Sequence, residues 1–315
     1  EKSHKFDKLR QQIENICAEA GIVWHPLPYT KNPPILSTIK DVMSIKKKAI
    51  ALHREYNFSL VHCRSYQAAI VGSILKKKYG VHFLFDMRGF WADERVDGGQ
   101  WNLKNPIYRL VYRYYKRKEK DFLLRADHVI SLTAKAKNEM FTWPYMLNIE
   151  DNIEVIPCCT DTALFDPGKV NNDVLEEKRR QLGIKPYDFI LSYVGGASLW
   201  YMVSEMLDFF KILLQKQPNA RFLYITTDNT IELKRLILEK RIPLGSVIIT
   251  GAARNEVPVL LSLSNATLFF IKPTYSKMSS SPTKQGEIMS MGLPLFCNAG
   301  IGDTDDIVTK YQAGI

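Results

Sequence analysis

The chain has 315 residues, 46% of them hydrophobic, which is enough for two domains that each bury a core. No apolar stretch approaches the roughly 20 residues that span a bilayer, the charged first residues lead into a helical pattern rather than a signal peptide, and the five scattered cysteines suggest neither a disulfide framework nor a zinc site. We therefore expect a cytoplasmic protein. Its net charge of +10 implies an anionic partner, such as nucleotide phosphates, anionic lipid headgroups or another polyanion.

In the first half of the chain, apolar runs of strand length alternate with longer segments of helical period, which is typical of a parallel sheet covered by helices. We expect strands at residues 22–25, 59–63, 81–85, 126–131 and 154–156. The intervening helices are expected at residues 5–20, 39–56, 66–79, 106–124 and 134–145. This pattern predicts a first α/β domain over residues 1–157.

The alternation breaks after Pro157, where an irregular segment and a charged helix at 174–182 predict an interdomain connection over residues 158–185. A second series begins there, with strands expected at 189–194, 221–226, 246–250, 266–271 and 295–298. Its helices are expected at 202–215, 231–240, 256–263 and 283–291. Residues 186–315 are therefore predicted to form a second doubly wound α/β domain.

A polar run opens the last predicted helix and is the most informative motif. Ser280, Ser281 and Thr283 can direct backbone N–H groups and hydroxyls at an anion, because the helix macrodipole favours negative charge there. Lys284 adds a mobile cation, and Glu287, one turn later on the same face, can accept hydrogen bonds from sugar hydroxyls. For any one of these residues an ordinary capped helix is the alternative. The ordered run predicts a site for phosphate and ribose.

Together with the following Met291-Gly292-Leu293-Pro294, this run resembles the SPxKxxE…xGxP motif of family 4 of the GT-B glycosyltransferases, which are retaining and use nucleotide-sugars. The resemblance extends more weakly over nearly the whole chain. It implies two Rossmann-like domains facing a cleft, loop amides that hold the donor diphosphate, and a ribose held by Glu287. Eight residues before that glutamate, where the family usually has another acid, this chain has Ser279.

The family resemblance also bears on the ends of the chain. A GT-B amino-terminal domain usually opens with a strand, whereas this chain opens on a helical pattern. The family also carries further helices beyond the position of Ile315. We therefore expect the chain to be truncated at both ends.

Two further loops follow predicted strands of the second domain. Gly195 and Gly196 lack side chains, so the backbone could approach a phosphate closely, although a tight turn is the alternative. The backbone of Thr250 and Gly251 could bind the edge of a nucleobase, as the matching loop does in the family, and Arg254 is either part of that site or a solvated charge. Ligands of doubly wound sheets lie beyond the carboxyl ends of the strands, so these loops are expected to converge on the donor.

The loop after the predicted strand at 81–85 is rich in carboxylates, arginines and tryptophans, which suggests an acceptor site in the first domain. Family 4 often has a histidine here, and this chain offers Asp86 and Arg88 as the catalytic candidates. The residues expected to bind the acceptor are Trp91, Asp93, Glu94 and Arg95. The alternative is a salt-bridged loop that only orders the domain. We interpret the isolated His62, His82 and His128 as structural.

The predicted helix at 106–124 interleaves basic and aromatic side chains. An anionic membrane surface, a solvated basic face and a nucleic acid are the three interpretations. Nucleic acid is the least favoured, because no nucleic-acid-binding motif accompanies the charge.

These observations predict a metal-independent hexosyltransferase without a cofactor. It would move a sugar with retention from a nucleotide-sugar to a saccharide or lipid-linked acceptor, in cell-surface polysaccharide or glycoconjugate synthesis, with Asp86, Arg88 and Glu287 as the catalytic group. Its place would be the cytoplasm or the inner face of the membrane. A nucleotide-sugar epimerase on the same fold and a non-catalytic binding module are the alternatives.

Overall fold

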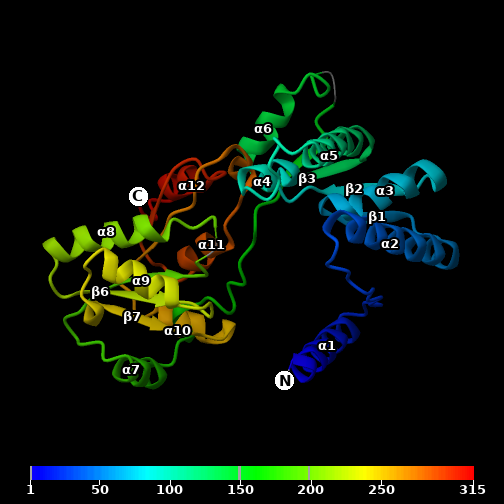
Figure 1. Cartoon of the computed structure of the whole chain (residues 1–315). Helices are drawn as coiled ribbons and strands as arrows, with labels where there is room; N and C mark the ends of the chain where they lie inside the picture. Colours follow the sequence, from blue (N-terminus) through cyan, green and yellow to red (C-terminus); the bar gives the residue numbers. More distant parts are fainter. Residues whose placement is uncertain (1, 148–149, 198) are drawn as a thin grey trace.

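The computed structural model describes residues 2–147, 150–197 and 199–315, and its described strands form two parallel sheets. Figure 1 shows one sheet in each half of the chain. The first sheet contains β1 (Leu60–Arg64), β2 (His82–Asp86), β3 (His128–Ser131) and β4 (Ile153–Val155). The second contains β5 (Phe189–Val194), β6 (Ala220–Ile225), β7 (Val247–Thr250), β8 (Ala266–Phe269) and β9 (Leu295–Cys297).

Helices connect the strands throughout. Those of the first half are α1 (Lys2–Glu19), α2 (Pro34–Tyr56), α3 (Ser65–Tyr79), α4 (Trp91–Asp97), α5 (Pro106–Arg125) and α6 (Ala134–Thr142). Those that follow are α7 (Asn172–Gln181), α8 (Val203–Lys216), α9 (Ile231–Glu239), α10 (Val257–Leu261), α11 (Thr283–Ser290) and α12 (Thr304–Lys310). Short 3₁₀ turns are η1 (Pro167–Lys169), η2 (Leu244–Ser246), η3 (Arg254–Glu256) and η4 (Tyr275–Ser279). None of the described helices is long and apolar enough to cross a membrane.

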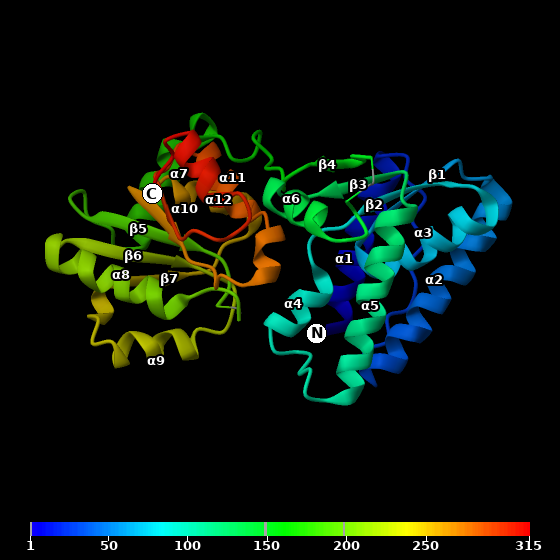
Figure 2. The ribbon, with the colours of Figure 1, turned by 90° about the horizontal axis from the view of Figure 1, so that it is seen from above.

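The first sheet has the order β1-β2-β3-β4, and its register aligns Arg64 with Asp86 at the carboxyl ends of β1 and β2. Phe83 and Phe85 of β2 are fully buried against Phe122 of α5 and other core residues. Helix α3 packs against both α2 and α5, so these three helices form one layer beside the sheet (Figure 2).

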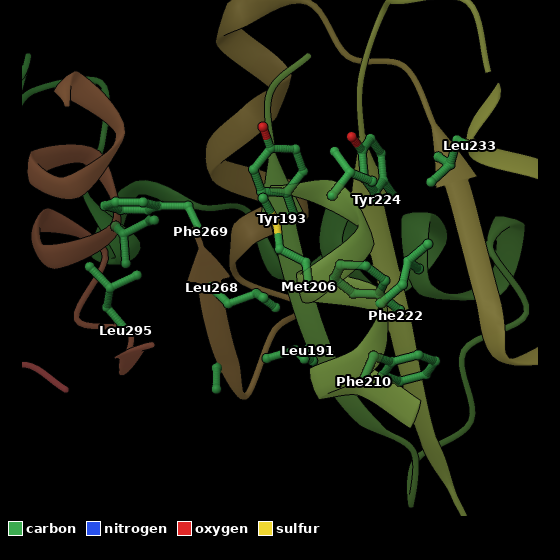
Figure 3. Close-up of a cluster of buried hydrophobic side chains, with 14 of the residues drawn as sticks. Leu191, Tyr193, Met206, Phe210, Phe222, Tyr224, Leu233, Leu268, Phe269 and Leu295 are labelled. Carbon is green, nitrogen blue, oxygen red and sulfur yellow. The ribbon is translucent and has the colours of Figure 1, made fainter. Parts of the chain in front are cut away.

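The second sheet has the order β7-β6-β5-β8-β9. From the central β5 the chain winds outward to β7 and then returns to the other side of β5, so the winding direction reverses between β5 and β8. Figure 3 shows the core of this sheet, where Phe210 of α8 stacks on Phe222 of β6 with ring centroids 5.2 Å apart. The inner strands β5 and β6 are buried on both faces, as is usual in parallel sheets.

The predicted fold class, α/β with two parallel sheets, is confirmed. The winding reverses in the second sheet, as predicted for both sheets, whereas the four strands of the first sheet follow chain order. The sheets lie within the predicted first and second domains, whose boundaries at 157 and 186 stay a prediction.

The strand predicted at 22–25 is wrong: Ile22 and Val23 are 58% and 70% exposed, and no strand is assigned there. Helices α4 and α12 were not predicted. Asp93 and Glu94 in the first turn of α4, which favour a helix start, were interpreted as site residues of a loop.

The two halves meet along α4 and η4, which Figure 1 shows between the sheets. Lys277 of η4 forms an ion pair with Glu94 at 2.8 Å, and the Ser276 N–H donates to Asp97 at 2.9 Å. Beyond η4, the carboxylate of Asp303 accepts hydrogen bonds from two backbone N–H groups in the first turn of α6, at 2.6 and 3.1 Å. These contacts bring the carboxyl ends of the two sheets together.

Helix α3 lies so close to the first sheet that one position tolerates only glycine. A Cβ on Gly72 would lie 2.5 Å from Cys63 Sγ and 2.7 Å from the ring of Phe83. We expect Gly72→Ala to lower the free energy of unfolding by about 1–3 kcal/mol, because the core must move to admit a methyl group. Gly245→Ala, with open space around its Cβ, is the matched control. Equal urea-unfolding midpoints for the two variants would contradict this packing.

Candidate functional site

The loop after β5 brings its backbone close to a lysine. Gly195 has φ +143°, and a Cβ there would lie 2.6 Å from Lys284 Nζ and 2.9 Å from the Tyr193 hydroxyl. The Tyr193 hydroxyl donates to the carbonyl of Gly196 at 2.8 Å. A side chain on Gly196 would collide with the carboxylate of Asp228. Gly195 is therefore needed for the turn, and both glycines leave the backbone open to close approach.

Lys284 of α11 lies among aromatic rings. Its Nζ is 3.8 Å from the ring centroid of Tyr201 and 4.5 Å from that of Tyr193, whose hydroxyl lies 3.4 Å away. Burial lowers the pKa of Lys284 to about 7, although the charge of Glu287 acts in the opposite direction. The ring faces attract the ammonium form. An anion bound beside Nζ would raise this pKa again, so the position is suited to a phosphate.

Glu287 is held by a neighbouring loop. Its Oε1 lies 2.9 Å from Nη1 of Arg254, and its carboxylate is buried while the arginine side chain is 61% exposed. The guanidinium also lies over the ring of Phe165, 5.2 Å from its centroid. The sequence left open whether Arg254 is a solvated charge, and the structure pairs it with Glu287. The arginine fixes the orientation of the carboxylate.

The start of α11 carries no side-chain cap, because its N-cap residue is Pro282. The Ser281 hydroxyl accepts a hydrogen bond from the Cys158 N–H at 3.1 Å, and the carbonyl of the exposed Thr283 accepts one from the Thr160 hydroxyl at 3.5 Å. The first N–H groups of the helix are thus available to an anion.

Ser280 joins η4 to this helix. Its N–H donates to the carbonyl of Lys277 at 3.1 Å, and its own carbonyl lies against Gly302, where a side chain would not fit. Ser280 therefore shapes the loop through its backbone.

A cavity of about 550 Å³ runs along β7, from Leu244 and Val247 at its start to Thr250 and Gly251 at its carboxyl end. Thr250 and Gly251 line it together with Thr226 and Lys234, and Ile249 contributes an apolar wall. This volume is in the range of small-molecule sites. The loop that runs from Gly251 to the start of η3 connects the cavity to the ion pair of Glu287.

On the first-domain side, Asp86 ends β2 with its carboxylate buried. Its Oδ2 lies 3.5 Å from Nε2 of His62, and its Oδ1 has no hydrogen-bond partner among the described residues. Arg88 adopts a positive φ of +58°, and its Nη2 lies 3.4 Å from Sγ of Cys158. Because the Cys158 N–H binds the Ser281 hydroxyl, this loop adjoins the start of α11.

The four predicted acceptor residues all have partners within the protein. Trp91 packs against Tyr66, Trp101 and Tyr115, and the guanidinium of Arg95 lies 5.0 Å from its ring centroid. Glu94 is engaged by η4, as described above. These side chains therefore order the domain and its contact with η4, and an acceptor role for them stays a prediction.

Asp93 belongs to a buried ionic network. It accepts hydrogen bonds from the Tyr112 hydroxyl at 2.7 Å and from Nζ of Lys116 at 3.0 Å. Lys116 also pairs with the fully buried Glu119, which accepts a hydrogen bond from Tyr66. Burial raises the pKa of Glu119, while the Lys116 ammonium acts against that shift. Within the described residues, no group of three or more His, Cys, Asp or Glu side chains is arranged to hold a metal ion.

Comparison with known proteins assigns the chain to a family. The family model described as Glycosyltransferase Family 4 matches residues 7–164. The chain belongs to glycosyltransferase family 4. A D-inositol 3-phosphate glycosyltransferase of Segniliparus rotundus is 21% identical over 173 residues, which cover 55% of this chain and 36% of that relative. The matched part thus spans about a third of that protein's length.

Solved structures of glycosyltransferases share the fold over nearly the whole chain. A sucrose-phosphate synthase of Thermosynechococcus elongatus has a TM-score of 0.65 at 19% identity and covers 92% of this chain and 67% of its own. A glycosyltransferase of Rickettsia africae has a TM-score of 0.66 at 16% sequence identity, and the match covers 96% of this chain and 72% of that one. Anabaena HepE in complex with UDP-glucose has a TM-score of 0.63 at 14% sequence identity, and the match covers 93% of this chain and 71% of that one. The family 4 chain therefore has the GT-B fold.

Sequence reasoning missed several residues that shape this family 4 site. Tyr193 and Tyr201 surround Lys284. In the sequence these two tyrosines could not be distinguished from ordinary core residues. Figure 3 shows Tyr193 beside Tyr224 with both hydroxyls pointing the same way. The pairing of His62 with Asp86 could have been found from the register of β1 and β2, since both lie near the carboxyl ends of adjacent strands.

Burial of the Lys284 ammonium lowers the free energy of unfolding by a measurable amount. An unfolded lysine keeps its proton up to about pH 10.4, whereas folded Lys284 releases it near pH 7, so the wild type gains stability as pH rises between these values, by up to about 1.4 kcal/mol per pH unit. Lys284→Met removes this gain. We expect the variant to be the more stable protein at about pH 7 and its advantage to shrink by about pH 9.

Urea unfolding of both proteins across that pH range measures the difference. Lys211→Met, at an exposed lysine of α8, is the matched control and should follow the wild-type profile. Parallel profiles for the wild type and Lys284→Met would contradict the shifted pKa.

Proposed function

We propose that the protein transfers a hexosyl group from a nucleotide-sugar to a saccharide or lipid-linked acceptor, with retention of configuration and without a metal ion. The observation that carries the proposal is the cluster of Gly195, Lys284, Glu287 and Arg254 at the carboxyl ends of β5 and β7 and the start of α11. The cluster combines a close backbone approach, a desolvated cation and an oriented carboxylate. A nucleoside diphosphate needs all three features.

The donor diphosphate lies at the N-terminus of α11, beside Lys284 and the backbone of Gly195 and Gly196. When the bond between the sugar and the diphosphate breaks, negative charge grows on the departing phosphate oxygen. The helix amides and the Lys284 ammonium, which burial largely removes from water, neutralise that charge. Glu287 binds the ribose hydroxyls and orients the donor without attacking it.

The nucleobase enters the cavity lined by Thr250 and Gly251, because the loop between that cavity and Arg254 leads directly to the ribose-binding carboxylate. UDP-glucose, which HepE binds in its solved complex, is the first donor to test. The acceptor hydroxyl meets Asp86 and Arg88 across the seam between the two halves. The wider role is a step in the synthesis of a cell-surface polysaccharide or glycoconjugate.

Incubation with UDP-glucose and other nucleotide-sugars tests the activity. Slow release of nucleoside diphosphate supports the transferase. Isomerisation of the sugar without release would point to an epimerase, and binding without either reaction would point to a non-catalytic module. A thermal-shift screen with nucleoside diphosphates selects the donor, because a ligand at 100 times its Kd stabilises a protein by roughly 2.7 kcal/mol.

Glu287→Ala should cost about 1.5–3 kcal/mol of nucleoside diphosphate affinity, since two ribose hydroxyls lose a charged acceptor. Calorimetric titration with UDP and with uridine separates the ribose from the phosphates. Lys284→Met should weaken UDP binding and leave uridine binding nearly unchanged, whereas Glu287→Ala should weaken both. A folded Glu287→Ala protein with wild-type affinity would remove Glu287 from the ribose site.

Asp86→Asn and Arg88→Ala should lower transfer to an acceptor far more than they lower donor affinity, because the donor is bound by the other half of the chain. A purely structural role predicts a lower melting temperature and parallel losses of every activity. Asp127→Asn is the matched control for the structural outcome, since Lys76 and the Phe83 N–H both bind its carboxylate. If Asp86→Asn behaves like Asp127→Asn, the acceptor role of Asp86 is wrong.

A further inference from the structure

Helix α5 presents apolar side chains to solvent. Ile107, Leu110 and Tyr114 are 58%, 67% and 44% exposed. Their spacing of three and four residues places them along one stripe of the helix, while Phe122 and Leu123 of the same helix are fully buried in the first-domain core. The helix thus has a second apolar face, and the solvated basic face considered from the sequence does not explain it.

Arginines border this stripe. Arg109, Arg113 and Arg117 recur every fourth residue and are exposed. The ion pairs that α5 makes within the described residues involve Lys116 and Arg125, so Arg113 and Arg117 have no carboxylate partner there. These guanidinium groups are available to an external anion.

The neighbouring helices extend the charge. Basic residues outnumber acidic ones by seven to two in α5, by five to two in α2 and by three to none in α3. These helices form the layer seen in Figure 2, and their combined excess is about as large as the net charge of +10 of the whole chain. The positive charge is therefore concentrated on one layer of the first half.

We infer that the outer face of α5 is a docking surface for an anionic lipid bilayer. Ile107, Leu110 and Tyr114 enter the boundary between headgroups and acyl chains, and Arg109, Arg113 and Arg117 bind lipid phosphates. A stripe of exposed apolar side chains bordered by basic ones is the pattern of a helix that lies in the membrane interface. A nucleic acid would use the arginines but leave the apolar stripe in water, so the bilayer explains more of the surface. This inference does not depend on the proposed transferase activity.

Vesicle flotation tests the inference with the wild-type protein. We expect binding to vesicles of phosphatidylcholine mixed with phosphatidylglycerol and none to phosphatidylcholine alone. Raising the salt from about 0.1 M to about 1 M shortens the Debye length from about 10 Å to about 3 Å and should weaken binding strongly. Equal binding to neutral and anionic vesicles, or no binding to either, overturns the inference.

Paired variants locate the surface. Arg113→Glu with Arg117→Glu should weaken vesicle binding at least 30-fold, because each basic residue near the membrane contributes roughly a factor of five. Lys211→Glu with Lys216→Glu on α8 makes the same change of charge elsewhere and should have little effect. An equal loss in this control means that binding follows net charge alone, which overturns the assignment to α5.

A second pair tests insertion. Ile107→Ser with Leu110→Ser should weaken binding about tenfold, since two partly inserted side chains lose their apolar burial. Ile212→Ser with Leu238→Ser, at residues 57% and 59% exposed on other helices, is the matched control. Unchanged binding of the α5 pair overturns the insertion.

Circular dichroism checks folding, and UDP titration gives an independent readout that these variants should leave unchanged. Tighter binding of the wild type to RNA than to anionic vesicles, lost in the arginine variant, would replace the bilayer by a nucleic acid.

Discussion

A buried contact between Ser279 and the loop after β2 joins the two halves at the α4–η4 contact. The buried Ser279 hydroxyl accepts a hydrogen bond from the Phe90 N–H at 2.9 Å and donates one to the Ser276 carbonyl at 2.6 Å. A side chain at Gly89 would not fit, because its Cβ would lie 2.9 Å from Oγ of Ser279. A carboxylate at the same position could accept from Phe90 but could not donate to Ser276, so two oxygens would face each other in a buried site. The serine therefore permits a seam that an acid in its place would disfavour.

Two residues proposed to bind the donor follow this seam in the chain. The helix that follows Ser279 carries Lys284 and Glu287, and the first of these is kept in surroundings that disfavour its charge. A protein selected for stability alone would place a methionine or leucine between two tyrosine rings. In the proposed donor complex an anion beside Nζ would offset this cost, and the free energy lost in the empty protein would then contribute to the binding of a diphosphate. The neighbouring Glu287 differs from Lys284, because its carboxylate is paired with the guanidinium of Arg254.

The sequence was sufficient for those parts of the structure that depend on local patterns. Strand β5 was predicted with its observed bounds, and the run from Ser280 to Glu287 was correctly placed at the start of a helix. Contacts between distant segments were not predictable in the same way. Ser279 and Phe90 are 189 residues apart, and nothing local indicates that they meet. The strand expected at 22–25 failed for a related reason, because an apolar run becomes a strand only where another strand is available to pair with it.

Contacts between distant segments also reduce the number of candidate catalytic carboxylates in the first half. Of four carboxylates at the end of β2 and in α4, Asp93, Glu94 and Asp97 are each bonded to a partner that orders the fold. Asp86 alone among them keeps a buried oxygen without a partner in the described structure, and two residues later Arg88 holds a backbone conformation that is unfavourable for a side chain. An unbonded buried carboxylate oxygen costs about 1–3 kcal/mol, and a positive φ adds to that. Two unfavourable features so close together, beside the proposed donor site, are better explained by an acceptor that completes them than by a connector loop.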